Sequence, residues 1–232
     1  MPQRYTVLDS PAEIRHQIEI KKSRFLTVLK RIESEDQATD LLADLRREFH
    51  DARHHCSAWV LGPDRRLQRS SDDGEPSGTA GVPMLEAITQ RRTEPGGAAE
   101  SLQDDLTDLS DVCAVVVRWF GGTLLGAGGL VRAYSDSVSQ ALDQAAYTQR
   151  ARMAHCDVPA SLAEAARWEN ELRSAGIQVL DTSWAAHGAT LHVATHDTPS
   201  HVAELEMFVA QLTSGTAPLV QQTSEWMDLP AA

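Results

Sequence analysis

The chain has 232 residues, 42% of them hydrophobic and 23% charged, a balance that predicts a globular protein of one large or two ordinary domains. No run of about 18 apolar residues occurs, and the opening residues lack the apolar centre of a signal peptide, so the sequence predicts a cytoplasmic protein without membrane-spanning segments. The net charge of -12 argues against binding nucleic acid over the whole surface, because that mode of binding needs a basic field.

The charge is distributed unevenly along the chain. Residues 1–150 contain 18 Lys and Arg against 23 Asp and Glu, whereas residues 151–232 contain 3 against 10. Nearly all cationic side chains therefore belong to the first part, and an acidic partner is expected to bind there.

The first segments are predicted to form strands followed by a helix. Residues 4–8 and 14–32 show the alternation of apolar and polar side chains that is typical of strands, interrupted by Lys21-Lys22-Ser23-Arg24. We expect a hairpin with a basic turn; the alternative is that this turn is basic only because it is solvated. Residues 35–49 place apolar side chains at helical spacing after an acidic first turn, which predicts an amphipathic helix.

A His-His-Cys sequence precedes a strand predicted at residues 57–61. His54, His55 and Cys56 invite a zinc interpretation, but adjacent residues on a strand point to opposite faces, so at most two of them share one metal. The other cysteines, Cys113 and Cys156, are distant and complete no Cys-x-x-Cys pair. We expect neither a metal nor a cofactor, and a packing or hydrogen-bonding role for one histidine.

Residues 70–85 are rich in turn formers, which predicts an irregular loop that ends where a helix begins near Met84. Three carboxylates, Asp72, Asp73 and Glu75, fall within four positions of this loop. They are suited to binding a hard cation, to acting as acid and base, or to pairing with Arg24, Arg53 or Arg118. The composition is also typical of a loop that lines a ligand site.

Residues 112–142 predict a buried strand, a glycine turn and a helix, because a β-branched run is followed by apolar residues at spacings of three and four. The turn contains Gly121, Gly122, Gly126, Gly128 and Gly129. A helix N-terminus has unpaired N–H groups and a partial positive charge, so this turn is suited to phosphate or carboxylate, together with Arg118 and Arg132. The alternative is that the glycines serve only the backbone geometry, and their spacing matches neither the P-loop nor the dinucleotide-binding pattern.

A different pattern follows Arg150. Strands are predicted at 153–158 and 218–226, a hairpin at 177–185 and 189–194, and helices at 162–175 and 202–212. This βαββαβ order is the ferredoxin-like plan. His192 and His196 are spaced to share one face of the hairpin with a metal, but we expect ordinary solvent-facing histidines on a sheet with one open face. Residues 91–111 have no such periodicity and predict a mobile loop with at most a short helix near 99–106.

Four of these segments together resemble the IMPACT family, in particular its bacterial YigZ-like branch. They are KKSRF at 21–25, DARHHCSAWV at 51–60, SDDGEPSGTAGVPML at 71–85 and VVVRWFGGTLLGAGGLVRAYSDSV at 115–138. The resemblance covers almost the whole chain, and four separate motifs in the right order make it specific. It implies an α+β protein of two domains, residues 1–150 and 151–232.

The resemblance also implies relatives for each domain. The first would be similar to the βαβ fold shared by a small-subunit ribosomal protein domain, elongation factor G domain IV and GHMP-type small-molecule kinases. The second, ferredoxin-like domain looks like the last domain of elongation factor G. Eukaryotic relatives act as translational regulators that interfere with activation of a starvation-responsive kinase of an initiation factor, and the role of the bacterial branch is left open.

Residues and resemblance together favour a non-enzymatic, translation-associated regulatory protein that binds RNA or a ribosome-associated partner. The expected anion- or RNA-binding cleft combines basic, acidic and glycine residues: Lys21, Lys22, Arg24, Arg53, His54, His55, Asp72, Asp73, Glu75, Arg118, Gly121, Gly122, Gly126, Gly128, Gly129 and Arg132.

Two other functions are compatible with the sequence. One is an enzyme acting on a phosphorylated small molecule or nucleotide, in which the glycine turn binds phosphate and Asp72, Asp73 or Glu75 serves as base or magnesium ligand. The other is a protein-interaction module whose acidic second domain meets a basic partner. The sequence does not determine the oligomeric state.

Overall fold

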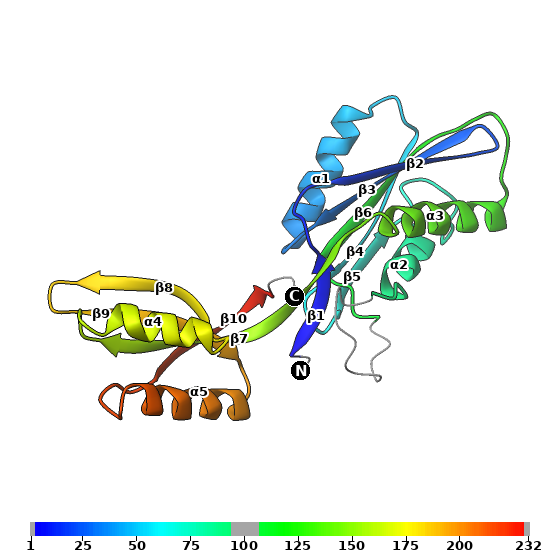
Figure 1. Ribbon diagram of the computed structural model, residues 1–232. Coiled ribbons are helices and arrows are strands. Elements are labelled where there is room, and N and C mark those ends of the chain that lie inside the picture. Colours follow the sequence, from blue (N-terminus) through cyan, green and yellow to red (C-terminus); the bar gives the residue numbers. More distant parts are fainter. Residues whose placement is uncertain (1–2, 94–106, 230–232) are drawn as a thin grey trace. The chain divides into compact units, whose positions relative to one another are not determined.

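The computed structural model describes residues 3–93 and 107–229, and confirms the predicted α+β fold class (Figure 1). The chain divides into two compact units. One contains the residues up to Gln149 together with Leu229, and the other is Arg150–Asp228. Among the described residues, no helix has the length and apolar character needed to cross a membrane.

The first unit is built on an antiparallel sheet with the strand order β2-β3-β6-β4-β5. The strands are β2 (Ile14–Ile20), β3 (Ser23–Arg31), β4 (His54–Leu61), β5 (Leu67–Ser71) and β6 (Val112–Trp119). The predicted hairpin of β2 and β3 is confirmed by their register, which pairs Ile14 with Leu29 and Ile20 with Ser23. The central strand β6 is buried along its length up to Arg118, which explains its continuous apolar sequence.

Helices cover both faces of this sheet (Figure 1). Helix α1 (Glu35–Glu48) packs on one face, and α2 (Gly81–Thr89) and α3 (Ala127–Leu142) pack on the other. Because side chains alternate along a strand, Val115 and Val117 of β6 point to α1, whereas Ala114 and Val116 point to α2 and α3. This alternation decides which polar side chains near the end of β6 can meet.

Three element boundaries differ from the sequence predictions. Strand β4 begins at His54 instead of residue 57, and β5 extends to Ser71, inside the stretch predicted to be irregular. Helix α2 begins at Gly81, ahead of the predicted start near Met84. The earlier start of α2 has a tertiary cause. The Asp72 carboxylate, eight residues before Ala80, accepts hydrogen bonds from the backbone N–H groups of Ala80 and Gly81 and so caps the helix N-terminus.

The second unit has the predicted βαββαβ order. Its elements are β7 (Tyr147–Ala160), α4 (Ala165–Ser174), β8 (Gln178–Ala185), β9 (Gly188–His196), α5 (Pro199–Leu212) and β10 (Val220–Asp228). Strand β7 is longer than predicted: its residues 147–149 belong to the first unit, as does β1 (Arg4–Leu8), and from Arg150 on it pairs with β10 and β9.

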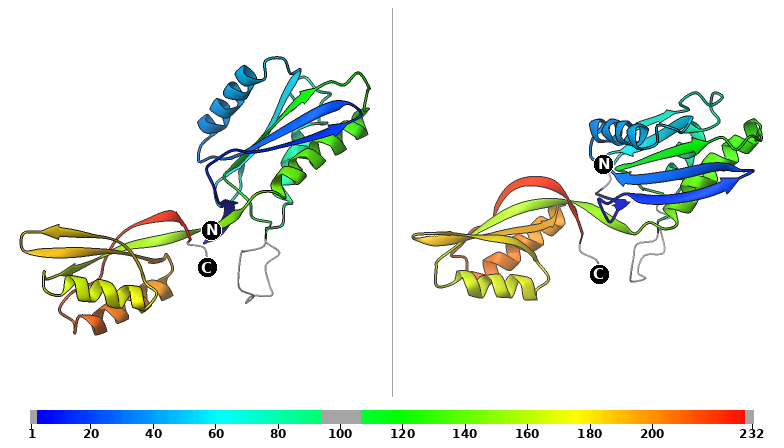
Figure 2. Two further views of the ribbon diagram at one scale, coloured as in Figure 1. Left: turned by 45° about the horizontal axis from the view of Figure 1, so that its top comes forward. Right: turned by 90° about the horizontal axis from the view of Figure 1, so that it is seen from above.

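Both helices of the second unit cover the same side of its sheet (Figure 2). Trp168 and Leu172 of α4 and Leu205 and Val209 of α5 enclose a core with the inward-facing residues of β7 and β9. The opposite face of the sheet is left open and polar. The short helix predicted near residues 99–106 lies outside the described residues.

Candidate functional site

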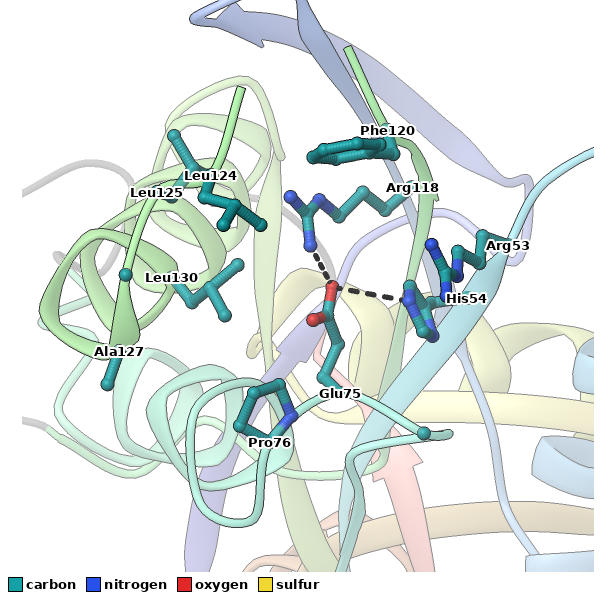
Figure 3. A pocket seen from close by; sticks show the side chains of 12 residues that line it. Arg53, His54, Glu75, Pro76, Arg118, Phe120, Leu124, Leu125, Ala127 and Leu130 are labelled. Atoms are coloured by element: carbon teal, nitrogen blue, oxygen red, sulfur yellow. Dashed lines mark hydrogen bonds and ion pairs between the residues drawn. The ribbon is translucent and has the colours of Figure 1, made fainter. Parts of the chain in front are cut away.

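A pocket of about 380 Å³ opens in the first unit, where the loops after β5 and β6 meet the first turn of α3 (Figure 3). It combines charged side chains with an apolar wall. The lining residues are Arg53, His54, Gly74, Glu75, Pro76, Arg118, Phe120, Leu124, Leu125, Gly126, Ala127 and Leu130.

Arg118 lies in the pocket wall and is only 5% exposed. The β6 alternation turns it toward α2 and α3, and its neighbours across the sheet are Phe25 on β3 and His54 on β4. Its guanidinium lies over the Phe25 ring, 5.3 Å from the centroid, and over the Phe120 ring, at 5.8 Å. Figure 3 shows the group reaching between Phe120 and Glu75, where Nη1 donates to Glu75 Oε1.

Glu75 neutralises this buried cation. Its side chain is 4% exposed, and Oε1 also accepts a 2.8 Å hydrogen bond from the Tyr134 hydroxyl. The second carboxylate oxygen, Oε2, accepts no hydrogen bond from the described residues, and Figure 3 shows it on the side facing Leu130. The Nε group of Arg118 is likewise buried without a partner among the described residues. The pair therefore retains one acceptor, Oε2, beside the pocket (Figure 3), whereas the Nε donor is enclosed by protein.

A tyrosine and a cysteine complete what we call the buried network: Cys56, Tyr134, Glu75 and Arg118. The Cys56 thiol lies 3.3 Å from the Tyr134 hydroxyl oxygen and 3.0 Å from the carbonyl oxygen of Asp72. Burial raises the pKa of Cys56 to about 12 and raises that of Tyr134 as well. Both groups are protonated at neutral pH, so Cys56 is a structural thiol, not a nucleophile.

His54 presents one ring nitrogen to the pocket. Its Nδ1 lies 2.8 Å from the carbonyl oxygen of Asp73, and a carbonyl can only accept, so Nδ1 carries a proton. In the neutral ring this leaves Nε2 as the lone-pair nitrogen, 3.8 Å from Glu75 Oε1. His54 is thus oriented to accept a hydrogen bond from a ligand or, when protonated, to pair with Glu75.

The other two carboxylates of the loop hold its backbone. Burial by itself would raise the pKa of Asp72, but hydrogen bonds from the N–H groups of Gly78, Gly81 and Ala80 outweigh it and lower that pKa. Asp73 accepts a 2.6 Å hydrogen bond from the N–H of His55 and a 2.7 Å bond from Arg46. Of the three carboxylates singled out in the sequence, Glu75 is the one that lines the pocket.

The glycines position the surrounding loops. A Cβ on Gly121 would lie 2.0 Å from the carbonyl carbon of Lys22, so only glycine lets the β2–β3 turn pack against the end of β6. This contact places the turn with the exposed Lys21 and Lys22 beside Gly121, the residue that follows Phe120. Gly126 precedes α3 with φ 74°, a backbone conformation that favours glycine, and no side chain caps the helix. Gly126 and Ala127 line the pocket, so the uncapped N–H groups of the first turn lie at its edge.

The expected single basic cleft is not formed as predicted. Arg118, expected to add a cationic donor to the cleft, is buried and paired with Glu75, which is one of the pairings that the sequence left open. Arg24 lies on the opposite face of the sheet, with its guanidinium 4.5 Å from the centroid of a Trp119 ring. The physical reason is the strand period of two, which places Arg24 and Trp119 on one face and Phe25 and Arg118 on the other.

His55 and several other predicted site residues also lie away from the pocket lining. His55 is buried on the α1 side, and this burial lowers its pKa, assisted by the positive charge of Arg46. Arg132 is exposed on α3. The remaining predicted residues outside the lining are Lys21, Lys22, Asp72, Asp73, Gly121, Gly122, Gly128 and Gly129.

Two participants were not identified from the sequence. Tyr134 falls among the apolar positions of the predicted helix within residues 112–142, although a tyrosine hydroxyl in a core requires a hydrogen-bond partner and so signals a polar group nearby. Arg46, on the exposed side of α1, had no sequence signal for its pairing with Asp73, which is 27 residues away. Within the described part of the chain, no three His, Cys, Asp or Glu side chains are grouped as metal ligands.

The chain is similar in sequence to a described protein family and to several bacterial proteins. Residues 21–142 match the family model described as the Impact N-terminal domain. The chain is 42% identical over 158 residues to "IMPACT family member YvyE" of Bacillus subtilis, covering 68% of this chain and 65% of that protein. It is 46% identical over 128 residues to "IMPACT family member YigZ" of Escherichia coli, covering 54% and 55%.

A yeast relative and a solved structure extend the comparison. "Protein IMPACT homolog" of Saccharomyces cerevisiae is 33% identical over 109 residues, covering 45% of this chain and 35% of that protein. A solved structure titled "Crystal structure of an hypothetical protein" is 31% identical with a TM-score of 0.59, covering 97% of this chain and all of the other. The matches to the bacterial relatives named above span between half and two thirds of those proteins' length.

Proposed function

The chain belongs to the IMPACT family, and from that premise we propose that it is a translation-associated regulatory protein whose first unit binds single-stranded RNA, with one unstacked base in the pocket. The association with translation rests on what the family resemblance implies for eukaryotic relatives. The choice of RNA rests on the chemistry of the pocket and of the surface beside it.

The observation that carries the proposal is a partly exposed aromatic ring above a hydrogen-bonding floor. Phe120 is 42% exposed and stacks over Arg118. Arg118 lies between this ring and Glu75 (Figure 3), so a base against Phe120 would meet the guanidinium first, with the Glu75 Oε2 acceptor deeper in the pocket. Single-stranded RNA is recognised in this way, by stacking on an aromatic side chain and hydrogen bonds to the base edge.

The surroundings of the pocket suit the phosphates on either side of such a base. Arg53 lines the pocket and is exposed, and Lys21 and Lys22 project from the turn that packs against Gly121. The uncapped first turn of α3 adds backbone N–H donors at the pocket rim. Because the rest of the chain is acidic, this local group of cations would determine where RNA binds.

The alternative enzyme acting on a phosphorylated small molecule or nucleotide is less well supported. It needs Asp72, Asp73 or Glu75 as a magnesium ligand or base. Asp72 is held by three backbone N–H groups, Asp73 by Arg46 and the His55 N–H, and Glu75 by Arg118 and Tyr134. Magnesium-dependent affinity for nucleotides would reverse this preference.

The proposal is tested by fluorescence anisotropy with a labelled single-stranded RNA across a salt series. Phe120→Ala should weaken binding by about tenfold, from the loss of roughly 1–3 kcal/mol of stacking on one base, without changing the salt dependence. Lys21→Ala with Lys22→Ala should instead reduce the slope of log affinity against log salt by about 1.4, since each phosphate contact to a single strand contributes roughly 0.7.

Arg66→Ala serves as the matched control, because this exposed cation lies on the turn between β4 and β5, outside the pocket lining, and pairs with Asp64. It should change neither affinity nor slope. Absence of RNA binding at low salt, or unchanged affinity in Phe120→Ala, would contradict the proposal. Arg118→Ala is unsuitable as the test variant, because it leaves the Glu75 charge buried without a partner and disturbs the fold.

Co-sedimentation with ribosomes tests the translational part separately. Salt-sensitive association that the Lys21→Ala, Lys22→Ala double variant loses would support it. RNA binding without any ribosome association would leave the pocket assignment in place and remove the translational one.

A further inference from the structure

The open sheet face of the second unit carries three side chains joined in one line, which we call the serine cluster: Ser183 on β8, His192 on β9 and Asp157 on β7. Ser183 Oγ lies 2.6 Å from His192 Nε2, and His192 Nδ1 lies 2.6 Å from Asp157 Oδ1. The other oxygen of Asp157 accepts a 2.9 Å hydrogen bond from Gln222 of β10. Four strands of the sheet therefore contribute to the arrangement.

The direction of each hydrogen bond follows from the groups involved. An ionised carboxylate can only accept, so the His192 proton next to Asp157 sits on Nδ1. In the neutral ring Nε2 is then a lone pair, and the Ser183 hydroxyl must donate to it. The order of hydroxyl, imidazole and carboxylate is that of a nucleophile, its general base and the group that orients the base.

The backbone departs from regular pairing at the two strands that complete the cluster. In β8 the register shifts between Val179 and Asp181: Val179 pairs with the buried Val193, whereas Asp181 pairs with His192. The inserted residue reverses which side chains face the open side, and Ser183 follows Asp181 on that side. Without it, Thr182 would occupy the position of Ser183. Bulges are common where a strand redirects a side chain near a functional site.

The second irregularity lies in β10, between Gln221 and Ser224, and contains Gln222. Gln222 lies two residues after Val220, which is paired with Asp157, so Gln222 is on the same sheet face as Asp157 and reaches it diagonally. Both irregularities of the sheet therefore border the same cluster. Regular pairing of β8 with β9 would not have placed Ser183 on the face of His192.

The cluster is accessible from solvent. Ser183 is exposed, and the side chains of His192 and Asp157 are 33% and 26% exposed. Helices α4 and α5 cover the other side of the sheet, so an electrophile can approach Ser183 from the open side (Figure 2).

We propose that Ser183 is an activated nucleophile that accepts an acyl group from an activated ester. Ser183 Oγ would form a bond to the acyl carbon while its proton moves to His192 Nε2. The bond from the acyl carbon to the leaving oxygen then breaks, and His192 returns the proton to the departing alkoxide or phenolate. The products are O-acyl Ser183 and an alcohol or phenol, with no change in oxidation state.

The experiment uses the full chain and p-nitrophenyl acetate, with the acetylated residues quantified by peptide mass spectrometry over time. Ser200, an exposed serine at the start of α5, is the internal control. Acetylation of Ser183 should exceed that of Ser200 by on the order of a hundredfold, the lower end of what a positioned general base contributes. His192→Gln should reduce Ser183 acetylation to the level of Ser200.

Asp157 acts as a positioning residue, so Asp157→Asn needs a readout that a structural role would not move. The variant should slow Ser183 acetylation and also remove the downfield proton resonance of His192 Nδ1, while the melting temperature stays the same. Ser183 acetylation no faster than at Ser200, or unaffected by His192→Gln, would overturn the proposal. All three residues are at least partly exposed, so these substitutions leave a folded protein in which either result can be measured.

Discussion

Each unit of this protein contains a line of hydrogen-bonded polar side chains, and the two lines differ in burial. Every member of the buried network in the first unit is at most 9% exposed. The serine cluster of the second unit lies on an open sheet face, with its histidine and aspartate side chains 33% and 26% exposed. Hydrogen-bond distances alone do not separate them, since the carboxylate–tyrosine contact is 2.8 Å and the histidine–aspartate contact is 2.6 Å.

Burial decides what such a network does for the molecule. A polar group that loses its partner inside the protein costs about 1–3 kcal/mol, and a charge costs more, whereas an exposed group can bond to water instead. The buried network is therefore coupled to the stability of the first unit. The serine cluster is free of this constraint, so its side chains can react or be exchanged while the fold persists.

The largest effect on stability is expected from removing Arg118, the cation of the buried network. Arg118→Ala leaves the Glu75 carboxylate buried without its cation and should lower the free energy of unfolding by about 3–5 kcal/mol, measured by urea denaturation. Glu75→Gln combined with Arg118→Met removes both charges and should cost clearly less than Arg118→Ala alone.

The matched control for Arg118→Ala is Arg167→Ala, which breaks exposed ion pairs with Glu164 and Glu171 on α4. This variant should change stability by about 1 kcal/mol at most. Equal losses in Arg118→Ala and Arg167→Ala would mean that burial of the Arg118 pair does not determine its contribution.

Removing the tyrosine hydroxyl tests the interior of the same network. Tyr134→Phe deletes the 2.8 Å hydrogen bond to Glu75 and a polar neighbour of Cys56, but keeps the edge-to-face contact with Phe25. The expected loss is about 1–2 kcal/mol, because Glu75 retains Arg118. Thermal unfolding of Tyr134→Phe beside Tyr147→Phe, a half-buried tyrosine that donates to the Leu142 carbonyl oxygen, would show whether the network or any tyrosine hydroxyl accounts for the effect.

Much of this arrangement follows from local pattern, and the rest does not. The β2–β3 hairpin, the α1 helix and the βαββαβ order of the second unit were all visible as periodicity, because each element buries one regular face. The pairing of Glu75 with Arg118 was one of several combinations compatible with the sequence, and nothing local distinguishes it from pairing with Arg24. That choice depends on which sheet face each strand residue occupies.

The serine cluster could not be predicted from the sequence, because it depends on which side of β8 Ser183 lies. His192 was expected to be an ordinary solvent-facing histidine, and periodicity would place Thr182, not Ser183, on its side of β8. The extra residue between Val179 and Asp181 reverses this assignment, and a single inserted position produces no compositional signal. Sequence patterns locate strands well, but a one-residue shift in register changes every contact that follows.

A smaller effect is expected from the pH dependence of His55. Burial keeps its pKa below the ordinary value, so the folded protein resists protonating this ring while the unfolded chain binds a proton below about pH 6.5. Stability should therefore decrease as pH falls from 7 to 5. His55→Gln should flatten this decrease, and His187→Gln, in an exposed turn, should leave it unchanged. A wild-type stability that increases as pH falls from 7 to 5 would contradict a lowered pKa of His55 as the cause.

The smallest change in the free energy of unfolding is expected for substitutions in the exposed serine cluster. Ser183→Ala and Asp157→Asn remove hydrogen bonds as short as those of the buried network, yet each should alter the free energy of unfolding by no more than about 0.5 kcal/mol. Water can replace each lost partner on the open sheet face. A loss as large as that of Tyr134→Phe would show that the serine cluster holds the sheet together, and would make a reactive role for Ser183 unnecessary to explain its geometry.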